Sequence, residues 1–542
     1  MISMKHITYF LLIIIGMTVY SQMNMSKQSY LKTKELDYIF SPDKISINEC
    51  FPKNSDFLWG VATASHQNEG NLNNNWTEWE KRNSLERSGI CTNSWEYWEN
   101  DLKRIKELGC QCYRFSIEWS RIMPVINTVS YSALNNYKNM ILKMKEMSIV
   151  PIITLHHFTR PIWIDVLYSG IHNSDIIFEF EKYTKVVMEE LGDLCNFWIT
   201  FNEPILECLH GYIRGTRPPG FIGDFCKFEL AIANVCEMHS RAYHIIHSYN
   251  ENAKVSIAKN FSLFRCDNSY DYFKNIISRK IYDYYNHSIL RALTCGELNL
   301  EFNLYVYTTG LKLKREEWKG TLDFIGLNHY NLSTVCISYN PVHPFDVIMS
   351  DKKLKYPVSD MGWDICGYSM YLSLIDLASY GLPIFITENG CADNTIDNKN
   401  RINFLKQCLK GLCMAEKEMN MTILGFCYWT LQDNFEWEDG YRPKFGLYTI
   451  DFDKLNKIIV KNRNNKNINQ CSSKKKEIKY ATLSKGGMLY RKIIHLWKSN
   501  KMYKLVKSNK KLLFQHLDDT MNDVSNINNS NMCYVLHKDK NE

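Results

Sequence analysis

Two glutamates stand directly after short apolar runs that are typical of buried strands. Glu203 follows residues 196–201, and Glu388 follows residues 383–387. If these strands lie across from each other in one sheet, the two carboxyl groups can face one another over a bound molecule. One carboxylic acid could then protonate a leaving oxygen while the other attacks or stabilises a cation-like carbon, which is the pairing that glycoside hydrolysis needs. Taken singly, each glutamate could equally be a salt-bridge partner.

Further polar and aromatic residues stand at the ends of other apolar runs. They carry amide, imidazole, guanidinium, phenol and indole groups, and they are Gln67, Arg114, His157, Asn202, Asn328, Tyr330, Trp429, Glu436 and Trp437. No cysteine or histidine cluster at zinc spacing accompanies them. We therefore expect a site without a metal or cofactor, built from side chains that suit a sugar.

Short apolar runs alternate with stretches of helical period along most of the chain. Strands followed by helices indicate parallel pairing, and eight of them indicate a closed barrel, so we predict an α/β fold, a single (β/α)8 TIM barrel with extended loops. An open doubly wound sheet is the alternative, but no G-x-G-x-x-G follows the first strand. The predicted strands are Phe57–Thr63, Cys112–Glu118, Val150–His156, Asn196–Phe201, Lys254–Lys259, Leu322–Leu327, Pro383–Thr387 and Leu424–Thr430, with helices such as Trp95–Leu108 and Tyr137–Met147 between them.

The two ends of the chain differ from this central pattern. Residues 1–21 carry Lys5, an apolar run and small residues before Gln22, which is typical of a cleaved secretory signal. Residues 22–50 form an N-terminal extension, and residues 51–497 form the barrel domain. Within that domain we expect a β excursion at Phe445–Phe452, a disordered polar insertion near 461–476 and a closing helix at Leu489–Trp497. Residues 498–542 are a Lys/Asn-rich tail that we expect to be flexible.

Composition narrows the classes of function. The 542 residues carry a net charge of +7, much of it near the C-terminus, so a nucleic-acid partner is not indicated. Beyond the signal no stretch is long enough to span a bilayer. We expect a secreted or lysosomal glycoprotein that is not transmembrane after cleavage, with pairing among its 18 cysteines left open. Sequons occur at Asn24, Asn75, Asn260, Asn286, Asn331, Asn420 and Asn528.

Six ordered motifs carry a resemblance to a known family. They are Phe57–Thr63 with Gln67 and Glu69-Gly70, Tyr113–Ser116 with Trp119–Arg121, Thr200–Pro204, Ile386–Gly390, Asp433–Trp437, and Phe445–Leu447. Together they resemble glycoside hydrolase family 1, the β-glucosidase family, from about Phe51 to Trp497. Chance agreement of six ordered motifs is negligible.

The resemblance implies a retaining two-carboxylate mechanism and assigns roles to the matching positions. Glu388 would be the nucleophile, with Arg114 and Tyr330 holding its ionised form, and Glu203 would be the acid/base. Asn202 would bind the sugar 2-hydroxyl. The remaining substrate-binding positions would be Gln67, His157, Asn328, Trp429, Glu436, Trp437 and Phe445.

Departures from the family pattern refine the function. His66 stands where the family often has Tyr, and Phe158 stands where Trp is common, but neither change removes a catalytic group. Glu436 would repel a 6-phosphate, and the retained Glu203 distinguishes the chain from thioglucosidase-like members.

The predicted function is therefore a retaining exo-β-glycosidase acting on terminal β-D-glucosides. β-Galactosides and β-fucosides are further candidate substrates. The alternative is a catalytically silent, klotho-like sugar- or partner-binding protein on the same barrel.

Overall fold

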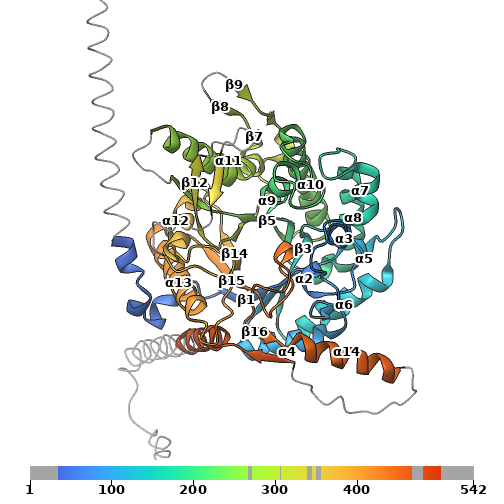
Figure 1. Ribbon diagram of the computed structural model, residues 1–542, viewed down its shortest axis with the longest axis vertical. Helices are drawn as coiled ribbons and strands as arrows, with labels where there is room; N and C mark the ends of the chain where they lie inside the picture. Colours follow the sequence, from blue (N-terminus) through green and yellow to red (C-terminus); the bar gives the residue numbers. More distant parts are fainter. Residues whose placement is uncertain are drawn as a thin grey trace, which may run out of the picture. The chain divides into compact units, whose positions relative to one another are not determined.

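Eight parallel strands close into a barrel in the first of two structural units, residues 1–493 (Figure 1). The structure, a computed structural model, describes residues 35–266, 272–304, 307–337, 345–348, 356–466 and 480–501. Each barrel strand coincides with one of the eight predicted strands, so the predicted (β/α)8 fold is confirmed. In barrel order they are β1 (Leu58–Ala62), β15 (Ile423–Trp429), β14 (Ile384–Asn389), β11 (Ile325–Asn328), β5 (Lys254–Asn260), β4 (Phe197–Asn202), β3 (Val150–His156) and β2 (Cys112–Ser116).

Helices occupy the crossovers between the strands and surround the barrel (Figure 1). The predicted helix Trp95–Leu108 is confirmed as α4, and the predicted helix Tyr137–Met147 lies in α6, which begins earlier because Ser130 caps it. The helices are α2 (Ser65–Asn68), α3 (Asn75–Arg82), α4 (Ser94–Leu108), α5 (Trp119–Ile122), α6 (Tyr131–Glu146), α7 (Ile162–Tyr168), α8 (Ile176–Leu191), α9 (Pro204–Cys208), α10 (Phe225–Tyr249), α11 (Tyr272–Cys295), α12 (Tyr368–Leu377), α13 (Lys399–Met419) and α14 (Phe452–Lys466).

Small sheets outside the barrel make up the extended loops. A three-stranded sheet joins β6 (Leu263–Cys266), β12 (Leu332–Ile337) and β13 (Phe345–Ile348). The predicted β excursion is confirmed as β16 (Tyr448–Ile450), which pairs antiparallel with β17 (Ala481–Leu483). Two further antiparallel pairs are β7 (Glu297–Asn299) with β10 (Lys312–Lys314), and β8 (Phe302–Leu304) with β9 (Tyr307–Thr309).

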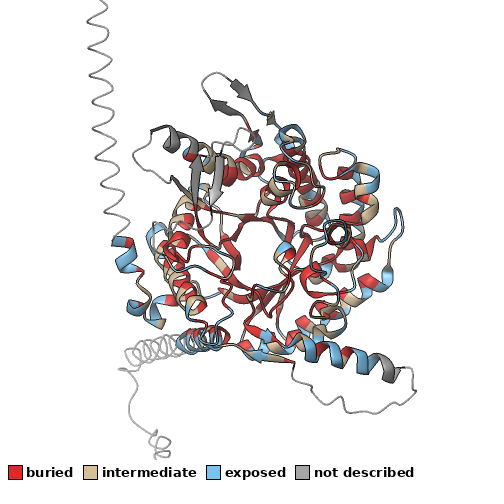
Figure 2. Cartoon of the chain, in the orientation of Figure 1, coloured by how far each residue is buried: buried red, intermediate tan, exposed pale blue. Residues whose placement is uncertain are grey.

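The barrel interior is closely packed with apolar side chains. Figure 2 shows the ring of strands buried almost throughout, as expected where helices cover the outside and side chains fill the inside. Gly60 on β1 lies in register with both Cys112 and Cys427. A Cβ atom at Gly60 would lie 2.3 Å from the Cys112 sulfur, so glycine is required for the three strands to approach. This packed core supports the C-terminal ends of the strands, where the site lies.

Three barrel pairings shift register near the C-terminal ends of their strands. The shifts lie between Ile199 and Asn202 on β4, between Leu327 and Asn328 on β11, and between Ile386 and Asn389 on β14. β-Bulges of this kind turn side chains away from the regular alternation and are common next to active sites. All three shifts adjoin residues that the sequence marks as functional.

The predicted disorder of the polar insertion is wrong for its first residues. Residues 461–466 belong to α14, because Leu455 and Ile459 pack with Ile450 and Tyr480 and extend the helix into the polar segment. The rest of the insertion up to 476 lies outside the described residues. The predicted closing helix is observed, since residues 485–493 of the first unit and 494–501 of the second are helical. The tail from 502 onward is outside the described part.

The predicted signal, residues 1–21, also lies outside the described residues. Of the extension up to residue 50, the described part packs on α13. The Gln407 amide donates to the Phe40 carbonyl at 2.7 Å, the Lys406 ammonium donates to the Pro42 carbonyl at 2.8 Å, and Lys410 pairs with Glu49 at 2.9 Å. The extension is therefore part of the folded unit from about residue 35.

Cys112 and Cys427, on the two barrel strands that flank β1, are both free thiols. The sulfurs of Cys112 and Cys427 lie 3.9 Å apart, almost twice the length of a disulfide bond. Within the described ranges no three His, Cys, Asp or Glu side chains gather as a metal site, and no helix is long and apolar enough to cross a membrane.

Candidate active site

The predicted site residues meet at the C-terminal ends of the barrel strands. Arg114 lies in β2, Asn202 ends β4, Asn328 ends β11, Glu388 lies in β14 and Trp429 ends β15. The other predicted residues stand in the segments that follow the strands, namely Gln67, His157, Glu203, Tyr330, Glu436, Trp437 and Phe445. Hydrogen bonds, one ion pair and ring contacts connect ten of these twelve residues into one network. Gln67 and Glu436 bind each other.

Glu388 is held by two strong donors. Arg114 forms a buried ion pair with it, the guanidinium nitrogen lying 2.5 Å from one carboxylate oxygen. The Tyr330 hydroxyl donates to the other oxygen at 2.6 Å. Charge-assisted hydrogen bonds such as these stabilise the ionised carboxylate and fix its orientation.

Glu203 has a different set of partners. The amide nitrogen of Asn328 donates to its carboxyl at 2.8 Å, and that of Asn260 donates to the same oxygen at 3.2 Å. The Glu203 backbone adopts φ 43°, a left-handed conformation that non-glycine residues rarely take. This conformation follows the β4 register shift and directs the side chain toward Asn328. The side-chain donors to Glu203 are therefore two amides, whereas those to Glu388 are a guanidinium and a phenol.

Asn202 and Asn328 link the two carboxylates. Arg114 donates to the Asn202 oxygen at 2.7 Å, and Asn328 donates to the same oxygen at 3.0 Å. The Asn328 oxygen accepts from Thr387, the neighbour of Glu388, at 2.7 Å. The nitrogen and the oxygen of the Asn328 amide are thus both hydrogen-bonded, and this side chain holds the two carboxylates at a fixed separation.

Burial and mutual repulsion act on Glu388 against its donors. Burial raises its pKa to about 7, and the nearby Glu203 charge raises it too, while Arg114 and Tyr330 lower it. The two carboxyl groups are therefore electrostatically coupled, as a working pair must be. Arg114 and Tyr330 both favour the charged form of Glu388.

Gln67 and Glu436 form one polar wall of the site. The Gln67 amide nitrogen donates to Glu436 at 3.1 Å and to the Phe435 carbonyl at 2.7 Å. The buried Gln67 oxygen has no hydrogen-bond partner among the described residues. Burial raises the pKa of Glu436 to about 8, although the Arg217 guanidinium lowers it. Near neutral pH this wall can thus offer both donors and acceptors to a hydroxylated ligand.

His157 is a neutral imidazole within the same wall. Burial, together with the charge of Arg114, holds its pKa well below its usual range. Because the Asn202 oxygen already accepts two bonds, the Asn202 amide nitrogen faces His157 Nε2, at 3.2 Å. Nε2 therefore accepts and Nδ1 carries the proton, and Nδ1 has no partner in the described part of the chain. It is a donor available to a ligand.

Aromatic rings complete the site. His157 stacks on Trp429 with centroids 5.9 Å apart and on Trp437 with centroids 6.1 Å apart. Phe445 packs edge-on against Tyr330 at 6.1 Å and is almost fully buried. Flat apolar faces beside hydrogen-bonding groups match the two faces of a pyranose ring.

Sequence reasoning missed several residues of the site. Asn260 ends β5 and donates to Glu203, and its own oxygen accepts from Tyr285 at 2.7 Å. Lys259 is buried beside it, and burial lowers the pKa of Lys259 to about 7 although the Glu203 charge raises it. Arg217 contacts the rings of Phe158 and Trp437. The end of the fifth predicted strand was the available signal, because the other strand ends carry site residues.

A parallel barrel whose strand ends hold two buried carboxylates, one clamped by Arg and Tyr and the other held by amides, defines a glycosidase. Residues 47–475 match the family model described as glycosyl hydrolase family 1, and the chain belongs to that family.

Similar proteins agree with this assignment. β-Glucosidase A of Thermotoga maritima is 30% identical over 427 residues, which cover 74% of this chain and 94% of that protein. Myrosinase 1 of Brevicoryne brassicae is 30% identical over 444 residues, with 74% and 94% covered. The structure of a β-glycosidase from Pyrococcus horikoshii superposes with a TM-score of 0.70 and is 29% identical, covering 82% of this chain and 95% of that one.

The hydroxyl of Tyr330 gives a testable electrostatic prediction. In Tyr330→Phe the ionised form of Glu388 loses a donor, so its pKa rises further. A nucleophile must be ionised to attack. We therefore expect the acid limb of the kcat/KM pH profile to move to higher pH by about one unit. Tyr183→Phe, which removes a buried hydroxyl bonded to the Leu155 carbonyl, is the matched control. An acid limb that stays in place or moves to lower pH contradicts the contact's role.

Proposed function

We propose that this protein is a retaining exo-β-glycosidase that hydrolyses terminal β-D-glucosides, with Glu388 as nucleophile and Glu203 as acid/base. The observation that carries the proposal is the unequal environment of the two carboxylates. Glu388 receives a guanidinium and a phenol, whereas Glu203 receives two amides. The first environment favours the anionic form that a nucleophile needs, and the second suits a group that gives and takes a proton.

The mechanism follows from these environments. Glu388 attacks the anomeric carbon while Glu203 protonates the departing oxygen, which leaves a glycosyl ester on Glu388. The negative charge beside Glu203 is then lost, and Glu203, now ionised, removes a proton from water. Water attacks the anomeric carbon and releases Glu388, so the product keeps its configuration. Arg114 and Tyr330 orient Glu388 at both stages.

The glucoside preference is supported by the polar wall and by the relatives. Gln67, Glu436 and His157 would bind the hydroxyls at positions 3, 4 and 6, and Asn202 would bind the 2-hydroxyl. Trp429, Trp437 and Phe445 would line the sugar faces, while Asn328 would act through Glu203. The Thermotoga maritima relative is named β-glucosidase A. β-Galactosides and β-fucosides are further candidate substrates, and both carboxylates are in place, so nothing favours the non-catalytic alternative.

Removing the nucleophile gives the most direct test. We expect Glu388→Ala to lose hydrolysis of nitrophenyl β-glucoside almost completely, because no ester can form. Added azide or formate should restore turnover with inverted product, since the small anion attacks from the vacated side. Glu179→Ala, which removes a buried glutamate bonded to Lys182 on α8, should keep its activity. A rescued product of retained configuration would rule out the assigned role.

The acid/base role predicts dependence on the leaving group. We expect Glu203→Ala to slow β-glucosides with poorly activated alcohol leaving groups by about 10²–10⁴-fold, the usual contribution of general acid catalysis. Dinitrophenyl glucoside needs no proton, so formation of its glycosyl ester should be much less affected. Pre-steady-state release of dinitrophenol measures that step. Equal losses on both substrates would indicate a structural role for Glu203.

We also propose that the chain enters the secretory route, with residues 1–21 removed and residues 51–497 as the hydrolase domain. Among the sequons in the described ranges, Asn75, Asn286 and Asn331 are buried, whereas Asn420 is exposed at the end of α13. In a eukaryotic secretory host we therefore expect an N-terminus at Gln22 and a glycan at Asn420. Mass spectrometry of the secreted protein and of Asn420→Gln tests both. Secreted protein that still begins at Met1 would contradict the predicted cleavage of residues 1–21.

A further inference from the structure

Four rings form a nearly parallel column beside the site. His66 stacks on Trp437 with centroids 5.4 Å apart and planes 8° apart. Trp437 stacks on His157 at 12°, and His157 stacks on Trp429 at 17°. Three of these rings belong to the predicted sugar site. His66 is the outer member, and no role is yet assigned to it.

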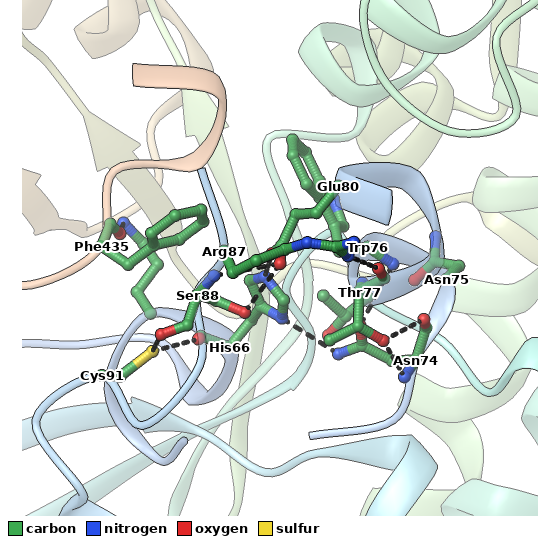
Figure 3. A network of polar contacts seen from close by, with 12 residues as sticks. His66, Asn74, Asn75, Trp76, Thr77, Glu80, Arg87, Ser88, Cys91 and Phe435 are labelled. Carbon is green, nitrogen blue, oxygen red and sulfur yellow. Dashed lines mark hydrogen bonds and ion pairs between the residues drawn. The ribbon is translucent and has the colours of Figure 1, made fainter. Parts of the chain in front are cut away.

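The hydrogen bonds of His66 define its protonation. The Asn74 oxygen accepts from the backbone nitrogens of Trp76 and Thr77, at 3.1 and 3.0 Å, as the cap of α3. The Asn74 amide nitrogen therefore faces His66 Nδ1, at 3.2 Å, so Nδ1 must accept (Figure 3). The proton is on Nε2, which donates to Glu80 at 2.9 Å. His66 is thus held as a neutral ring in a fixed plane.

Glu80 is anchored in turn. Its second oxygen accepts from the backbone nitrogen of Ser88 at 3.0 Å and from the Ser88 hydroxyl at 3.1 Å (Figure 3). The His66 side chain is completely inaccessible to solvent. Both ring nitrogens are therefore occupied by groups that the fold positions, and the ring can neither flip nor swing without breaking these bonds.

Trp437 needs such support. Its backbone has φ 49°, a strained conformation for a non-glycine residue that persists only when its surroundings hold it. Trp76 packs against it at 4.7 Å, and His66 stacks on its face. Residues next to both rings also bind each other, since the Phe435 nitrogen donates to the Gln67 carbonyl at 3.3 Å and Gln67 donates back to the Phe435 carbonyl at 2.7 Å.

We propose that His66 is a positioning residue for the sugar-binding wall, whose neutral ring supports Trp437 and keeps Gln67 and Glu436 in register. The inference rests on the proposed function, because that function makes this wall the sugar site. His66 touches no reacting atom. Its loss should weaken sugar binding more than it slows bond cleavage.

Two substitutions separate the ring from its hydrogen bonds. His66→Gln offers an amide to Glu80 and an oxygen to Asn74 but has no ring, whereas His66→Phe keeps a ring and loses both bonds. We expect His66→Gln to raise KM for nitrophenyl β-glucoside and Kd for deoxynojirimycin by about three- to tenfold, the factor that one aromatic pair supplies, with kcat changed less. His66→Phe should lower Tm but leave KM within about twofold of wild type.

His239→Phe is the matched control. His239 is a buried histidine whose two hydrogen-bond partners, the Thr200 hydroxyl and the Thr321 carbonyl, do not belong to the column. The His239→Phe variant should have a lower Tm than wild type, with unchanged KM and Kd. Wild-type KM and Kd in His66→Gln would overturn the inference, as would equal changes in KM for His66→Gln and His66→Phe. Calorimetric binding of deoxynojirimycin separates failure of this inference from failure of the proposed function. If wild-type protein binds deoxynojirimycin but hydrolyses no glucoside, only the proposed function is refuted.

Discussion

The buried guanidinium of Arg114 is the interaction on which the site depends. Besides Glu388, it donates to Thr154 on β3 at 3.1 Å, to the Thr387 carbonyl on β14 at 3.2 Å and to Asn202 on β4 at 2.7 Å. Because a buried charge is costly unless it is paired and hydrogen-bonded, these strands must present their acceptors together. The Arg114 guanidinium on β2 therefore connects β3, β4 and β14 and holds the Glu388 carboxylate in position.

The pattern of the sequence was sufficient for the fold and for locating the end of the barrel where the candidate residues meet. Eight apolar runs separated by helical stretches allow few arrangements, and the C-terminal strand ends of a parallel barrel identify the functional face. Glu203 and Glu388 could be selected because both stand at such ends. The motif resemblance then added residues in loops, such as Glu436 and Phe445, which periodicity alone does not place.

Other features depend on three-dimensional detail that no local pattern encodes. The contact of Asn260 with Glu203 arises from the β4 register shift, and single-residue shifts are not visible in an apolar run. The stacking of His66 on Trp437 joins two distant segments of the sequence. The extension of α14 through residue 466 was missed because composition favoured disorder, whereas packing of Leu455 and Ile459 extended the helix.

The register shifts have a consequence for how such a protein can diversify. All three lie near the C-terminal ends of their strands, although β14 also shifts register at its start, between Ile384 and Phe385. The irregular rim and the tightly packed strands around Gly60 are therefore under separate constraints. Substitutions near Gly60 are limited by the close spacing of the strands. Substitutions beyond the register shifts are limited mainly by contacts with the bound molecule. Natural variation at the rim can thus alter ligand preference while the packed barrel stays unchanged. This separation helps one fold to act on many substrates.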